Sequence, residues 1–88
     1  MNKEELKNKV ESAGDAVITY KSLNSRKTKY NVCTLEFSTP YIQNKKNRAK
    51  EDEHTVLMFC WDTDSFRLMK AENVVSVIPL SNILRNDE

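Results

Sequence analysis

Short runs of apolar residues with a period of two dominate the sequence between residues 16 and 80. They are AVITYKS (16–22), KYNVCTLEFS (29–38), HTVLMFCW (54–61), FRLMKA (66–71) and VVSVIPL (74–80). Alternation of this kind is typical of β-strands with one buried face, and a run that is apolar on both faces indicates a central strand. Because the connections are mostly short, the pattern predicts four or five antiparallel strands that form a meander.

The N-terminal residues follow a helical pattern instead. Asn2 is placed to cap a first turn, and Leu6, Val10 and Ala13 recur at the spacing of one helix face. Gly14 fits the position just after a helix, where a positive φ is needed. A helix of about 11 residues has only marginal stability in isolation. Its apolar stripe must therefore dock, either on the core of the same domain or on a second chain.

With 88 residues, the chain is long enough for one small domain. We expect an amphipathic helix over 1–14, a barrel-like domain over 15–80 and a short C-terminal turn and tail over 81–88. The segment 44–53 has Ala49 as its sole apolar residue, which predicts a flexible loop. A small sheet must cover two faces and two edges, so the expected fold is α+β, mainly β, with the meander curled into a small open barrel.

Several function classes are disfavoured by the sequence. No stretch approaches the length of a membrane-spanning helix, and the N-terminus has no apolar signal region, which predicts a cytoplasmic protein without membrane contact. Cys33 and Cys60 lie in strand-like runs, and with no other sign of an oxidising compartment the sequence favours reduced core thiols over one buried disulfide. Asp62 and Asp64 fit a turn better than a metal loop. We expect no enzyme activity, no cofactor and no metal site.

Charge is distributed unevenly, although the formal net charge is only +1. Residues 1–20 carry three lysines and four acids, residues 21–50 carry eight basic residues and one acid, and residues 51–88 carry three basic residues and eight acids. The central segment is therefore strongly basic and the C-terminal segment acidic. This layout suits binding to nucleic acid, binding to another protein, or association with a second copy of the chain.

The order of elements resembles the Sm-like barrel of WYL-domain proteins. The similarity runs from VITYKS (17–22) to FCWDTDSFRLMKAENVVSVIPL (59–80), and Arg67 matches an arginine in the strand before the last apolar strand. The resemblance implies a barrel fold and a nucleic-acid or regulatory role. The high content of Asn and Lys also resembles that of small phage accessory proteins.

Two functions compete at this point. The first is a regulatory protein-binding module, with a phage-type accessory protein that acts on a host protein as one form of it. Its expected contacts are the helix stripe and the acidic region around the tryptophan: Leu6, Val10, Trp61, Asp62, Asp64 and Arg67. The alternative is a nucleic-acid-binding or transcription-linked module, with phosphate contacts from basic residues and base stacking by tyrosines. Its expected residues are Lys21, Arg26, Lys27, Lys29, Tyr30, Tyr41, Lys45, Lys46, Arg48 and Lys50.

Overall fold

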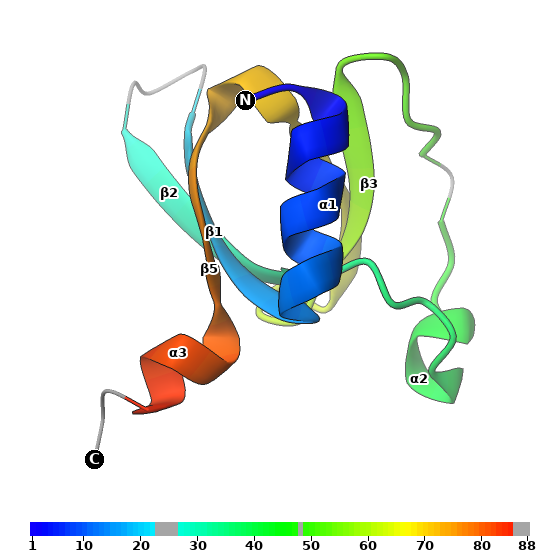
Figure 1. The fold of residues 1–88 in the computed structure, drawn as a ribbon. Coiled ribbons are helices and arrows are strands. Elements are labelled where there is room, and N and C mark those ends of the chain that lie inside the picture. Colours follow the sequence, from blue (N-terminus) through cyan, green and yellow to red (C-terminus); the bar gives the residue numbers. More distant parts are fainter. Residues whose placement is uncertain (23–26, 48, 86–88) are drawn as a thin grey trace.

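The computed structural model describes residues 1–22, 27–47 and 49–85 and confirms the expected fold class, α+β and mainly β (Figure 1). The elements, in chain order, are α1 (Lys3–Ala13), β1 (Asp15–Lys21), β2 (Thr28–Thr34), α2 (Pro40–Gln43), β3 (Thr55–Cys60), β4 (Ser65–Lys70), the short 3₁₀ helix η1 (Ala71–Asn73), β5 (Val74–Pro79) and α3 (Leu80–Arg85). Each of these strands overlaps one of the five predicted runs, and β1, β2 and β4 begin one residue earlier than predicted.

The five strands form one antiparallel sheet in the order β4-β3-β2-β1-β5. The predicted meander is therefore correct for β1 to β4, whereas β5 returns to pair with β1 on its other side. The sheet is not closed into a barrel, because β4 and β5 are its two edges. Pairing between β2 and β3 is restricted to Cys33 with Cys60 and Thr34 with Phe59. We call this short contact the β2–β3 seam.

Helix α1 begins and ends as its sequence predicts. The side chain of Asn2 accepts a hydrogen bond from the backbone N–H of Glu5 at 2.8 Å. Gly14 ends the helix with a φ of 77°, a conformation that costs other L-residues about 1–2 kcal/mol. Its backbone N–H donates to the carbonyl of Val10 at 3.0 Å. These two caps fix the length of the helix and the direction in which the chain enters β1.

The apolar stripe of α1 packs on one face of the sheet, which settles where it docks. Leu6 and Val10 are fully buried there. Figure 1 shows α1 lying across the strands. The core cluster that contains both residues includes side chains from all five strands and from η1: Ala16, Ile18, Tyr20, Cys33, Val56, Met58, Cys60, Met69, Ala71 and Val74. The stripe is thus part of the domain's own core.

The alternating runs predict burial of seven residues, and this prediction is only partly correct: Ile18, Leu35, Phe37, Leu57, Phe59, Leu68 and Val77. Ile18 and Phe59 are fully buried. Four other residues of this set are only half-buried: Leu35, Phe37, Leu57 and Val77. Leu68 is 37% exposed, so its predicted burial is wrong. Leu57 and Leu68 face each other across β3 and β4 on the side away from α1, where less of the chain covers the sheet.

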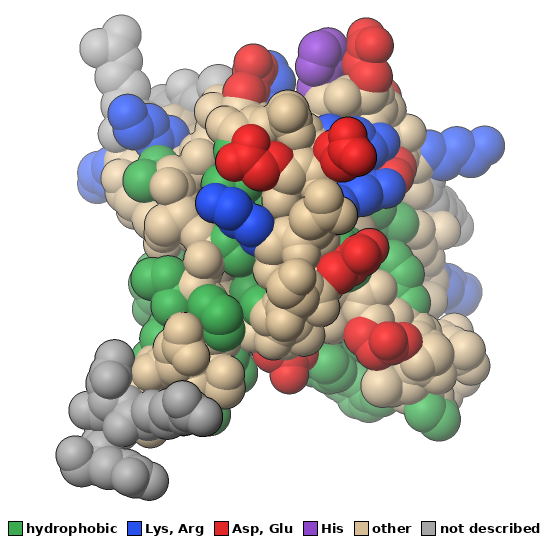
Figure 2. Space-filling view, viewed as in Figure 1, with side chains coloured by type: hydrophobic (Ala, Val, Ile, Leu, Met, Phe, Trp, Pro, Cys, Tyr) green, Lys and Arg blue, Asp and Glu red, His purple; other side chains and the backbone are tan. Residues whose placement is uncertain are grey.

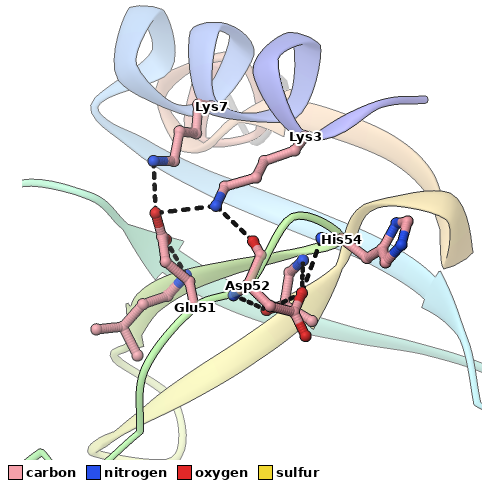
Figure 3. Close-up of polar contacts among 7 residues, drawn as sticks. Lys3, Lys7, Glu51, Asp52 and His54 are labelled. Atoms are coloured by element: carbon pink, nitrogen blue, oxygen red, sulfur yellow. Dashed lines mark hydrogen bonds and ion pairs between the residues drawn. The ribbon is translucent and has the colours of Figure 1, made fainter.

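The connection between β2 and β3 contains a helix that the sequence analysis missed. Pro40 occupies the first turn of α2, a position that suits its fixed φ and its missing N–H. At the other end of the connection, Glu51 bonds to Lys3 and Lys7 of α1 (Figure 3). The acidic end of the predicted loop 44–53 is therefore attached to the helix. Arg48 lies outside the described residues, and the flexibility of the whole loop stays a prediction.

The expected turn between β3 and β4 is formed by residues 61–64, with Asp64 at a φ of 55°, and Ser65 begins β4. The expected final turn is present as α3. No helix in the described part of the chain is long and apolar enough to span a membrane.

Candidate protein-binding surface

The face of the sheet opposite α1 carries a row of apolar side chains across four strands. Ile78 of β5 pairs with Val17 of β1, and Val17 pairs with Val32 of β2. The backbone N–H of Trp61, just after β3, donates to the carbonyl of Val32 at 2.7 Å and extends the row. Side chains at paired positions on one face are neighbours. We call Ile78, Val17, Val32 and Trp61 the outer row.

The outer row remains accessible to solvent. Ile78 is 41% exposed and Trp61 is 38% exposed, and the two valines between them are half-buried. Tyr30 lies in the neighbouring row, opposite Thr19, and is 68% exposed. A continuous apolar strip of this kind is unusual on a small soluble domain unless it contacts something. It is the strongest candidate for a functional surface in the described part of the chain.

The Trp61 end of the outer row is rigidly held. The indole Nε1 donates to the Asp15 carboxylate at 2.9 Å. The Tyr41 ring of α2 stacks on the indole, with a centroid distance of 6.2 Å and an interplanar angle of 22°. Phe59 meets the indole edge-on at 5.1 Å. Trp61 is thus fixed in one orientation before any partner arrives.

Asp64 and Lys45 form a polar pair beside the contact between Tyr41 and Trp61. Asp64 accepts hydrogen bonds from the Tyr41 hydroxyl at 2.5 Å and from Lys45 Nζ at 2.8 Å. Lys45 Nζ also lies 4.7 Å from the centre of the Tyr41 ring. The hydrogen bond from Lys45 lowers the pKa of Asp64, and the same bond raises the pKa of Lys45. Both groups therefore keep their charges at neutral pH.

The structure divides the predicted protein-binding residues into three places. Trp61 and Asp64 lie together on the surface just described. Leu6 and Val10 are buried in the core, so their assignment to a partner surface is wrong for the folded chain. Their burial stabilises α1 against the sheet and leaves no side-chain surface for a second chain.

Asp62 and Arg67 lie at a different position and meet through Asn31. The buried Asn31 side chain donates to Asp62 at 3.0 Å, accepts from the Tyr20 hydroxyl at 2.6 Å, and lies 3.4 Å from an Arg67 nitrogen that donates to it. The Arg67 guanidinium also lies 5.3 Å from the centre of the Tyr20 ring. Asn31 thus bridges Arg67 and Asp62.

The predicted nucleic-acid-binding residues separate into two groups. One group lies at the β1–β2 hairpin: Lys21, Lys27, Lys29 and Tyr30. The other lies in or after α2: Tyr41, Lys45, Lys46 and Lys50. Arg26 and Arg48 lie outside the described residues. Figure 1 places the end of β1 and the start of β2 at the upper left and α2 at the lower right, so the described basic residues do not form one surface.

The face that carries α1 also lacks a uniform charge. Figure 2 shows Lys and Asp or Glu side chains mixed over this face. Part of the mixture is Lys3 and Lys7 of α1, which pair with Glu51. This face is therefore a poor candidate for contacts with a phosphate backbone.

Four residues of the candidate surface were not predicted from the sequence: Asp15, Val17, Val32 and Ile78. Alternation put Val17 and Val32 on the second face of their strands, but it did not indicate that β5 pairs with β1. That pairing brings Ile78 beside Val17. The contact of Asp15 with Trp61 joins residues 46 positions apart and leaves no local signal.

Comparisons with protein-family models, with curated proteins and with solved structures gave no match to this chain.

Proposed function

We propose that this protein is a small non-enzymatic regulatory module that binds another protein through the outer row and the Trp61–Tyr41 pair. The observation that carries the proposal is the half-exposed apolar row across four strands, which ends in an immobilised tryptophan. As a phage-type accessory protein, it would act in the cytoplasm on a host protein.

The arrangement has the properties of an interface anchor. Buried aromatic side chains dominate the binding energy of many protein interfaces. Asp15 and Tyr41 already hold Trp61 in place, so little side-chain entropy is lost when a partner binds. Val17, Val32 and Ile78 supply a flat apolar surface beside this anchor.

The charges around Trp61 indicate the chemistry of the partner. Asp15 and Asp64 are both exposed near the indole and the Tyr41 ring. Lys45 already pairs with Asp64 and lies over the Tyr41 ring, so Asp15 is the carboxylate beside the indole that favours arginine or lysine on the other molecule. We therefore expect a partner with an apolar surface bordered by basic residues.

The test is affinity capture from a nuclease-treated lysate, followed by measurement of affinity for the purified partner. Ile78→Lys places a charge within the outer row, and Leu84→Lys is the matched control on α3, where Leu84 is 60% exposed. Ile78→Lys should weaken binding at least about tenfold, whereas Leu84→Lys should leave it unchanged. Thermal melts followed by circular dichroism verify that both variants are folded. Equal binding by the two variants would contradict the proposed surface.

Nucleic-acid binding is the second candidate, favoured by a basic cleft at the hairpin end. Lys21, Arg67 and Lys70 line a cleft of about 220 Å³ together with Tyr20. Because a role of this kind is what the resemblance to WYL-domain proteins implies, we keep it as the alternative. It predicts binding to single-stranded oligonucleotides that weakens steeply with salt, and a flatter salt dependence in a Lys21→Ala/Lys29→Ala variant. The protein-binding proposal predicts no such affinity at physiological salt.

A further inference from the structure

The two cysteines face each other across the β2–β3 seam. Cys33 pairs with Cys60 in the register, and their sulfur atoms are 3.2 Å apart. The hydrogen bond from Trp61 to Val32 marks the adjacent pair as the hydrogen-bonded one. Cys33 and Cys60 therefore occupy a non-hydrogen-bonded pair, in which Cα atoms are about 4.5 Å apart. This separation falls within the range that disulfides span.

A cross-link between the two cysteines would join two parts of the sheet at the β2–β3 seam. The register holds seven residue pairs between β1 and β2 and six between β3 and β4, but two between β2 and β3. The seam thus joins the two larger parts of the sheet through very few backbone contacts. A bond between Cys33 and Cys60 would connect these parts covalently at their weakest contact.

We propose that Cys33 and Cys60 are a reversible cross-strand disulfide site, which is oxidised by a low-molecular-weight disulfide such as oxidised glutathione. The Cys60 thiolate attacks the small disulfide, forms a mixed disulfide and releases one small thiolate. The Cys33 thiol then loses its proton, attacks the Cys60 sulfur and expels the second small thiolate. The two cysteines lose two electrons and two protons in total, and the small disulfide becomes two thiols.

The electrostatics of the pair assign the first attack to Cys60. The hydrogen bond between the two sulfurs lowers the pKa of Cys60 and raises the pKa of Cys33. Either sulfur can donate in this hydrogen bond, and the lowered pKa makes Cys60 the better nucleophile of the two. Both thiols are fully buried, so the small disulfide reaches them when the short seam opens.

Closing the bond requires a movement of about 1.2 Å between the sulfurs, from 3.2 Å to the usual bond length. The bond would close a long loop that contains the whole connection between β2 and β3. Loops of this length give a cross-link a stabilising effect in the chain-entropy description. By linkage, the folded chain must then favour the disulfide more than the unfolded chain does, by the same free energy.

The test compares folded and unfolded protein in the same glutathione buffers. Free thiols are trapped with an alkylating reagent, and mass spectrometry counts the intramolecular disulfide and the mixed disulfides. We expect the equilibrium constant for the intramolecular disulfide to be on the order of 100-fold larger in the folded chain than in concentrated guanidinium chloride. Cys33→Ala controls for mixed disulfides at Cys60. A ratio below about tenfold, or mixed disulfides alone, would overturn the proposal.

Discussion

Replacement of Glu51 by glutamine tests how the connection before β3 is attached to α1. One oxygen of Glu51 lies 2.7 Å from Lys7 Nζ and 3.2 Å from Lys3 Nζ (Figure 3). The other oxygen accepts the backbone N–H of Leu57 at 2.9 Å. The hydrogen bond from Lys7, and after it the bond from Leu57, lowers the pKa of Glu51 from 4.5 to about 2. Glu51→Gln keeps the shape of the side chain but removes its charge.

The pKa shift gives the sign and the size of the effect. The pKa is lower in the folded chain, so the stabilisation is fully present above about pH 5 and is lost as the pH falls toward about 2. A shift of this size corresponds to about 3.4 kcal/mol if it is fully expressed. The Glu51 side chain is 30% exposed, and solvent screening reduces the expected contribution to about 1–2 kcal/mol.

Urea unfolding at several pH values measures this contribution. The free energy of unfolding of Glu51→Gln should lie about 1–2 kcal/mol below that of the wild type at neutral pH. The difference should shrink toward zero near pH 2. Glu53→Gln is the matched control, because the Glu53 side chain is 85% exposed, and it should change stability by less than about 0.5 kcal/mol. A difference that stays constant with pH, or an equal loss in the control, would refute the role of Glu51.

Three further perturbations have defined outcomes. Phe59→Ala should lower the free energy of unfolding in urea by about 3–5 kcal/mol, because the ring is fully buried, and a loss near zero would mean that the ring is not packed. Gly14→Ala should lower the free energy of unfolding by about 1–2 kcal/mol because of the φ of 77° at this position. No atom lies within 4 Å of an added Cβ, so a steric clash does not add to this cost. An unchanged melting temperature would contradict this expectation. Amide exchange should be faster at Lys46 and Lys50 than at Thr55, whose N–H donates to Asp52. The opposite order would contradict the attachment of the acidic end of the loop 44–53 to the rest of the domain.

Much of the fold was predictable because its signals are local. The caps of α1 and the alternation of the strands depend on residues a few positions apart, and each was identified correctly. The pairing of β5 with β1 joins segments about 60 residues apart. No local pattern distinguishes that arrangement from a simple five-stranded meander.

Burial was harder to predict than secondary structure. Leu68 alternates correctly with its neighbours, yet its face of β4 is only partly covered. Leu6 and Val10 form a stripe that fits either a core or an interface, and only their contacts in three dimensions decide between these. Alternation shows which residues share a face, but it does not show which face the rest of the chain covers.

The candidate surface was predictable in part for the same reason. Trp61 and Asp64 were selected from their position at the end of an apolar run. Tyr41 and Lys45 were assigned to nucleic-acid binding, because their contacts with Trp61 and Asp64 exist only in the folded chain, where the connection between β2 and β3 packs beside β3. The structure thus combines residues from both predicted sites into one surface.

The most direct test of the outer row as a protein-binding surface is chemical-shift mapping of the isotope-labelled protein with its purified partner. The account predicts that the largest shifts occur at the outer row and at Tyr41, while the Lys21 to Lys29 hairpin changes little. The largest shifts at the hairpin or on α1, with the outer row unaffected, would contradict the account.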